Sequence, residues 1–139
     1  YIMSTTGISV PDEIIKFFKE FKLKKTDLFA ITLKIEGSNI VRSEEYKEKD
    51  LDKILSSLKD EEPRYILIDW EYETQDGRKA DKLVFVSWVS DNSPIKKKFT
   101  YGGTKESVKS SLSGISVSIH ATDLSELTAN IITEACNRY

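Results

Sequence analysis

The chain has 139 residues, a length that predicts one domain with room for a substantial core. Its hydrophobic fraction of 39% and charged fraction of 32% are typical of a soluble globular protein. The formal net charge of −2 argues against a general nucleic-acid binder. No apolar run approaches the ~20 residues that cross a bilayer, which predicts a protein that is not transmembrane.

The start of the chain and its cysteine content predict a cytoplasmic protein. No charged segment followed by an apolar run marks a secretory signal, and Cys136 has no second cysteine for a disulfide. Residues 1–2 precede Met3 and are interpreted as a remnant of expression. The expected domain therefore spans residues 3–139.

The N-terminal segment, residues 3–10, is small and polar and predicts a mobile arm. Pro11 fits the first turn of a helix, where a missing N–H has no consequence. The helix that follows has apolar residues at the spacing of one buried face, namely Ile14, Phe17, Phe18 and Phe21.

A hairpin and a second helix are expected next. Alternating residues from Phe29 to Ile35 predict a strand, which returns at Ile40 after a turn at residues 37–39. Tyr46 to Leu58 is interpreted as a helix whose apolar side carries Leu51, Ile54, Leu55 and Leu58.

Two strands in the middle of the chain are apolar on both alternations. They are predicted from Tyr65 to Tyr72 and from Lys82 to Val89, joined by a loop at Gln75–Arg78 that contains the turn signal Asp-Gly. A strand that is apolar on both faces belongs in the centre of a sheet covered by helices on each side.

A lysine-rich stretch from Pro94 to Thr104 leads into the next predicted helix, Lys105 to Gly114. Thr104 is interpreted as its N-cap, Glu106 as a first-turn acid, and Gly114 as its left-handed end. Between Pro94 and Lys109 there are five lysines and one glutamate in an otherwise acidic chain. This inversion of charge is the strongest functional signal in the sequence and indicates an acidic partner, with a solvated surface helix as the alternative.

The end of the chain predicts a strand over residues 115–119 and a helix from Ala121 to Asn137. The expected buried stripe of that helix is Leu124, Leu127, Ile131 and Ala135. The order of elements predicts an α/β fold of the α+β type, in which a central mixed sheet of about five strands lies between helices in a single domain.

Catalytic chemistry is not indicated. His120 is the one histidine, and Cys136 lies near the predicted buried stripe, where an inert packed thiol is expected. Neither belongs to a group with metal-ligand or nucleophile–base spacing. We therefore expect no metal, no cofactor and no enzymatic activity.

The lysine-rich stretch resembles a family signature. Asp91-x-x-Pro94-Ile95-Lys96-x-Lys98-Phe99-x-Tyr101-x-x-x-Lys105 is similar to the D-x-x-P-[VI]-[KR]-x-[KR]-M-x-Y-[AS]-S-[ST]-K pattern of the ADF/cofilin proteins, small regulators of actin. Other segments resemble the same family in the same order, namely Gly7-Ile8-x-Val10, Phe21 to Lys25, Arg64 to Glu73, Gly114-Ile115 and Thr122 to Glu126.

The resemblance implies the actin-depolymerising fold and an actin-binding mechanism. The helix after Thr104 would enter an apolar cleft of actin, and the amino-terminal arm would be a second contact. Such proteins prefer ADP-actin, slow its nucleotide exchange and sever filaments. The implied monomer-binding residues are Ser4, Thr5, Thr6, Gly7, Ile8, Lys96, Lys98, Phe99, Tyr101, Thr104, Lys105, Val108, Lys109 and Leu112.

A second, filament-binding site is implied at Arg78, Lys79, Lys82, Glu134 and Arg138. Here the sequence departs from the family pattern, because Ala80 and Ala135 occupy basic positions and Asp81 adds a negative charge. We expect filament binding and severing to be weaker than in typical members. Gly102-Gly103 also replaces the usual A-S, and Phe99 replaces a methionine.

The resemblance also implies regulation and a location. The family is inhibited by phosphorylation of a serine at the position of Thr6, with Ser4 nearby, and phosphoinositides would compete for the lysines Lys96, Lys97, Lys98, Lys105 and Lys109. The protein is expected to act as a monomer at the actin cytoskeleton. Alternatives on the same fold bind the Arp2/3 complex or filaments alone, and a phosphoinositide-binding adaptor is an alternative of another class.

Overall fold

The computed structural model describes residues 6–138, and its secondary structure follows the predicted alternation of helices and strands. In chain order the elements are α1 (Asp12–Lys22), β1 (Ala30–Glu36), β2 (Asn39–Tyr46), α2 (Leu51–Ser57), β3 (Arg64–Glu73), β4 (Lys79–Trp88), α3 (Ile95–Ser111), β5 (Val117–Ala121), the 3₁₀ helix η1 (Leu124–Glu126) and α4 (Ala129–Arg138).

The strands form one five-stranded mixed sheet in the order β2-β1-β3-β4-β5. Neighbouring strands are antiparallel except β4 and β5, which pair in parallel with Val84 beside Val117. Parallel neighbours need a crossover connection, and α3 provides it. The predicted fold, a mixed sheet of about five strands between helices, is confirmed.

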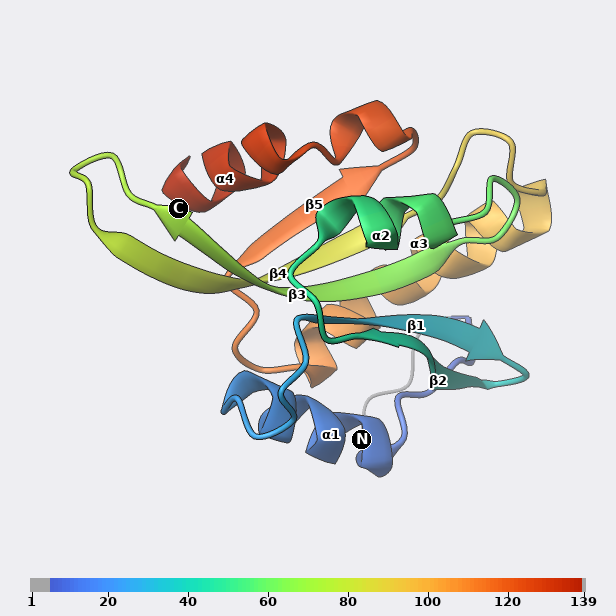
Figure 1. The fold of residues 1–139 in the computed structure, drawn as a ribbon. Coiled ribbons are helices and arrows are strands. Elements are labelled where there is room, and N and C mark those ends of the chain that lie inside the picture. The colour runs from blue at the N-terminus through green and yellow to red at the C-terminus, as the bar shows by residue number, and fades with distance from the viewer. Residues whose placement is uncertain (1–5, 139) are drawn as a thin grey trace.

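Helices cover both faces of the sheet (Figure 1). On one face, Ile66, Ile68, Val84 and Val86 pack in a cluster with residues of α2 and α4. On the other, Tyr65, Leu67 and Phe85 pack in a cluster with residues of α1 and α3. The prediction that β3 and β4 are central strands, buried on both sides, is therefore correct.

The second helix is shorter than predicted because β2 continues as far as Tyr46. Tyr46 pairs with Ala30 of β1, and its carbonyl accepts a hydrogen bond of 2.7 Å from the N–H of Phe29. Its side chain is buried, whereas the polar residues before it alternate along the edge of the sheet. The predicted apolar side of the helix is correct, with Ile54 fully buried and three leucines packed around the same cluster.

The last helix differs from the prediction in its start and in its phase. The predicted helix from Ala121 is divided into η1 and α4, with a break at residues 127–128. Because α4 starts afresh at Ala129, its buried side is set by Ile132, and Leu124 and Ile131 are 39% and 38% exposed. The predicted burial is correct for Leu127 and Ala135.

Candidate functional site

Helix α3 begins at Ile95, so the lysine run is the first turn of the helix and not a loop before it. Pro94, with φ −56° and ψ 143°, is the N-cap, and its carbonyl accepts a hydrogen bond from the N–H of Lys98 at 3.0 Å. The predicted N-cap, Thr104, lies inside the helix. The prediction failed because glycine weakens helix interiors, and Gly102-Gly103 therefore indicated a loop.

The loop before α3 is held in place by a carboxylate from the α2–β3 connection. The hydroxyl of Ser90 donates to Asp60 at 2.5 Å, and the side-chain amide of Asn92 donates to the same carboxylate at 2.6 Å. The N–H of Asn92 also donates to the Ser90 hydroxyl at 3.1 Å. These bonds fix the position of the loop through which the chain passes from β4 to α3.

The same bonds make the stability of the loop depend on pH. The hydrogen bond from Ser90, and then that from Asn92, lower the pKa of Asp60. A lowered pKa means that the stabilisation is present above the unfolded pKa of about 4 and is lost as the pH falls through the folded value.

We therefore expect Asp60→Asn to flatten the loss of stability in acid. Urea unfolding at neutral pH and at about pH 3 would give wild type a larger drop in midpoint than Asp60→Asn. The control is Asp52→Asn, because Asp52 is an exposed acid of α2 with no side-chain hydrogen bond within residues 6–138. Equal acid sensitivity of wild type and Asp60→Asn would contradict the expectation.

One side of α3 is buried against the sheet. The hydroxyl of Tyr101 accepts a hydrogen bond from the N–H of Ile35 at 2.9 Å, and the hydroxyl of Tyr65 donates to the Tyr101 carbonyl at 2.5 Å. Burial raises the pKa of Tyr65, so its hydroxyl stays protonated and remains a donor. These bonds join α3 to β1 and β3.

Four residues expected at a binding surface lie on this buried side. Tyr101 and Leu112 are 6% and 1% exposed, and the other two are fully buried, Thr104 and Val108. Their side chains cannot reach a partner in this conformation, which corrects the expected contact role to one of positioning the helix.

The opposite side of α3 is exposed and partly apolar. Ile95 and Phe99 are 84% and 78% exposed and stand one turn apart, with Gly102 and Gly103 on the same side. Sequence reasoning missed Ile95, although its i, i+4 spacing from Phe99 was a usable signal. The flanking cations are Lys96, Lys97, Lys98, Lys105 and Lys109, of which Lys109 lies 3.8 Å from Glu106.

Part of the amino-terminal arm is fixed to the body of the protein. Val10 is fully buried and Ile8 is 7% exposed. The N–H of Ser9 donates to the carbonyl of Ser38 at 2.9 Å, and the N–H of Ile40 donates to the Ser9 carbonyl at 3.0 Å. The predicted mobility is thus wrong for residues 6–10. The expected contacts Ser4 and Thr5 lie outside the described residues.

The arm reaches α3 at Thr6. The Thr6 and Thr104 hydroxyl oxygens are 2.7 Å apart, and Thr104 donates its own proton to the Thr100 carbonyl at 2.6 Å. Thr6 must therefore be the donor between the two hydroxyls. A Cβ added at Gly103 would lie 2.8 Å from the Thr6 methyl carbon. Gly103 thus leaves the space that the arm occupies.

The residues expected at a filament site gather at the β3–β4 hairpin and the end of α4. Arg78, Lys79, Glu134 and Arg138 are exposed, and the Asn137 amide donates to the carbonyl of Glu73 at 3.5 Å. Lys82 is different, because its ammonium donates to the Cys136 carbonyl at 2.8 Å. Lys82 therefore holds α4 against the sheet.

His120 and Cys136, the two residues considered for catalytic chemistry, lie on different elements, β5 and α4. His120 is exposed on β5, and its pKa is lowered first by partial burial and then by Lys105. Cys136 is buried in α4, and burial raises the pKa of its thiol. The expectation that Cys136 is a packed thiol is confirmed. No helix within residues 6–138 is long and apolar enough to cross a membrane.

The fold and this surface define a compact mixed-sheet domain that presents a cationic helix with an apolar strip. The model of the cofilin/tropomyosin-type actin-binding protein family matches residues 7–137, and the chain belongs to this family. The chain is 36% identical over 138 residues to the cofilin of Yarrowia lipolytica, an alignment that covers 98% of this chain and 90% of the relative.

Solved structures agree with this assignment. A crystal structure of Streptomyces griseoflavus cofilin superposes with a TM-score of 0.86 at 30% identity, covering 95% of this chain and 98% of that one. Plasmodium berghei actin depolymerization factor 2 gives a TM-score of 0.82 at 28% identity with complete coverage of both chains.

Proposed function

We propose that this protein binds actin monomers, with a preference for ADP-actin, through the exposed side of α3 and the adjoining arm. Bound there, it slows nucleotide exchange and promotes filament depolymerisation at the actin cytoskeleton of the cytoplasm. The observation that carries the proposal is the exposed pair Ile95 and Phe99, flanked by cations on a helix whose other side is fixed to the sheet.

The apolar residues and the lysines of this surface have different roles in binding. Large exposed apolar side chains provide most of the binding energy when they enter a pocket of a partner. Lys96 and Lys98 face an acidic partner surface, where charges speed encounter and set register more than they add affinity. Gly102 and Gly103 allow the partner and the arm to approach the helix closely.

Filament binding is proposed to be weaker than monomer binding. Lys79 is exposed at the hairpin, but Arg78 pairs with Asp76 at 3.0 Å. Lys82 is bound to the end of α4, and Asp81 adds a negative charge beside it. Monomer capture would then outweigh severing. Stable, stoichiometric decoration of filaments in a pelleting assay would contradict this part of the proposal.

The test is the release of a fluorescent nucleotide from ADP-actin as the protein is titrated. We expect saturable slowing, and a roughly fivefold higher half-effective concentration for Lys96→Ala/Lys98→Ala, since two exposed ion pairs contribute about 0.5 kcal/mol each. The control Lys16→Ala/Lys19→Ala removes two exposed lysines of α1 and should leave the titration unchanged. Absence of slowing would move the function to an Arp2/3-binding or filament-only relative, or to a phosphoinositide-binding adaptor.

Two forms of regulation are part of the proposal. Phosphorylation of Thr6 removes the hydroxyl proton that it donates to Thr104, and the added charge opposes an acidic partner. Ser4 is a second candidate for this modification. The lysine row of α3, which consists of Lys96, Lys97, Lys98, Lys105 and Lys109, would also attract phosphoinositide head groups. These head groups would compete with actin for the same side of the helix.

A further inference from the structure

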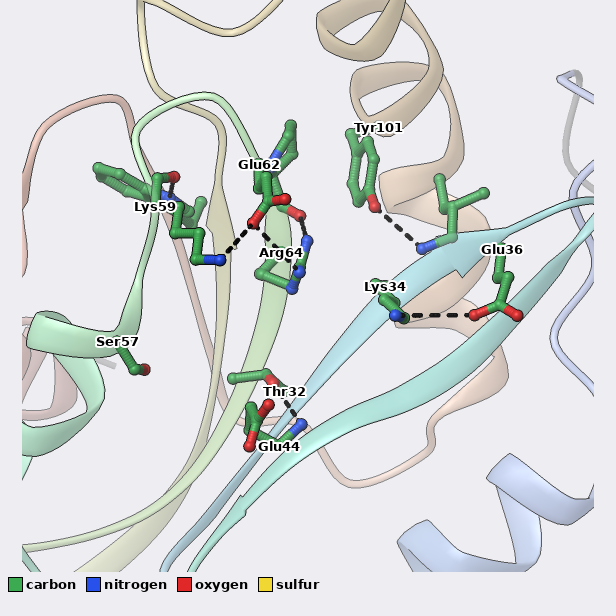
Figure 2. Close-up of polar contacts among 12 residues, drawn as sticks. Thr32, Lys34, Glu36, Glu44, Ser57, Lys59, Glu62, Arg64 and Tyr101 are labelled. Carbon is green, nitrogen blue, oxygen red and sulfur yellow. Dashed lines mark hydrogen bonds and ion pairs between the residues drawn. The ribbon is translucent and has the colours of Figure 1, made fainter.

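A hollow of about 410 Å³ lies beside the actin-facing side of α3, between the first half of that helix, the end of β1 and the start of β3. Ile35, Pro63 and the ring of Tyr101 form its apolar part. Figure 2 shows Lys34 of β1 and Arg64 of β3 in this region, with Tyr101 reaching down from α3. The volume is within the range of small-ligand sites.

Positive charge converges on this hollow from three elements. Its lining includes one acid, Glu62, and four cations, Lys34, Arg64, Lys96 and Lys97. Residues so far apart in the sequence meet there because β1 pairs with β3 and α3 packs across their ends.

The nearby acids neutralise these cations weakly. Glu62 lies 3.8 Å from Arg64 and shares its carboxylate with Lys59 at 3.9 Å, while Lys34 lies 3.6 Å from Glu36. All three separations are at the long end for an ion pair. Lys96 and Lys97 have no ion pair within residues 6–138.

Arg64 is the best placed of the four to recognise a ligand. Its side chain is 21% exposed, so the guanidinium is held between protein walls while part of it faces the hollow. One nitrogen donates to the Pro63 carbonyl at 2.7 Å. A guanidinium has five N–H donors in a planar fork, and this geometry matches a phosphate bidentately.

We propose that this pocket binds an oligophosphate, a small anion that carries two or more phosphate groups. A single phosphate would leave much of the volume empty and two of the four cations unneutralised. Two phosphates could be divided between Arg64 with Lys34 on the sheet side and Lys96 with Lys97 on the helix side. The site shares Lys96 and Lys97 with the lysine row of α3, but it adds Lys34 and Arg64 from the sheet, and Lys105 and Lys109 do not line it.

The test uses calorimetric titration of the free protein with sodium pyrophosphate at low salt, and it contains no actin. We expect saturable binding below about 1 mM. Lys34→Ala and Arg64→Lys should each weaken it about tenfold, because each removes a charge-assisted or bidentate contact. The matched control Lys16→Ala/Lys19→Ala removes two exposed lysines of α1 outside the pocket and should change binding less than about twofold.

Two results would overturn the proposal. One is the absence of saturable binding by wild type, and the other is equal weakening by the pocket and control variants, which would mean diffuse attraction to surface lysines. Arg64→Lys keeps the charge and the Lys34 side chain is partly exposed, so thermal unfolding should show both variants folded.

A second arm identifies the source of the phosphates. If a lipid head group enters the pocket, the Lys34→Ala variant should lose its binding to vesicles that contain phosphatidylinositol 4,5-bisphosphate. Unchanged vesicle binding, with pyrophosphate binding lost, would assign the pocket to a soluble oligophosphate.

Discussion

Replacement of Phe99 by alanine should weaken binding to ADP-actin about 30-fold, or about 2 kcal/mol, the cost of losing an aromatic anchor in an interface. Phe99 is 78% exposed, so its removal should not lower the stability of the free protein. The measurement is the nucleotide-release titration, with a urea unfolding curve for each variant. Ile95→Ala should have a smaller effect in the same direction, because isoleucine buries less area.

The matched control is Leu124→Ala. Leu124 is an exposed apolar residue, at 39%, but it lies on η1, outside α3 and the arm. The Leu124→Ala variant should bind ADP-actin as tightly as wild type does. If Phe99→Ala also binds normally while Lys96→Ala/Lys98→Ala does not, binding is electrostatic and the exposed apolar strip is not the anchor.

Replacement of Gly103 by alanine should detach the arm, whereas the same change at Gly102 should not. The new Cβ would lie 2.8 Å from the Thr6 methyl carbon, but at Gly102 it meets nothing within 4 Å. Thr6 must rotate or move, and either response breaks its bond to Thr104. Both variants gain helix propensity of up to about 1 kcal/mol, so stability alone cannot explain a difference between them.

Two readouts separate these variants. Amide exchange at Ser9 should speed up in Gly103→Ala and remain slow in Gly102→Ala, and actin affinity should fall about tenfold in Gly103→Ala, since a fixed arm costs less to bind than a free one. Adding Thr6→Ser to Gly103→Ala removes the clashing methyl but keeps the hydroxyl, and it should restore slow exchange. Equal exchange in both single variants would contradict the role of Gly103.

The same pair explains a departure from the family pattern. The pattern that this chain resembles has serine at the positions of Thr6 and Gly103. Here the arm residue is larger by a methyl group and the helix residue is smaller by a whole side chain. The two changes offset each other across the contact between the arm and α3, although their positions are far apart in the sequence.

Local patterns predicted much of the fold and part of the surface. The strands β3 and β4 were recognisable because they are apolar on both alternations, and the resemblance supplied Lys96, Lys98 and Phe99. The start of α3 was misplaced because Gly102-Gly103 resembles a helix stop, while Pro94 gives an equally valid start. No local sequence pattern distinguishes these two helix starts. Gly103 is explained by its contact with Thr6 of the arm, a residue far away in the sequence.

Other features depend on contacts between distant segments and had no local signal. Burial of Tyr101 and Thr104 depends on which side of α3 meets the sheet. The pocket at Lys34 and Arg64 exists because β1 and β3 are neighbours, although they are separated by a strand and a helix in the chain. Sequence spacing cannot reveal such a meeting.

The crossover position of α3 has a consequence for how the protein folds. Strands β1 to β4 are joined by antiparallel pairings, two of them formed by consecutive strands, but β5 can pair with β4 only after residues 89–116 have crossed the sheet. Such non-local pairing forms slowly. We expect α3 and β5 to complete the molecule last, so a partly folded chain would lack the proposed actin-binding surface and could not compete with mature protein for its partner.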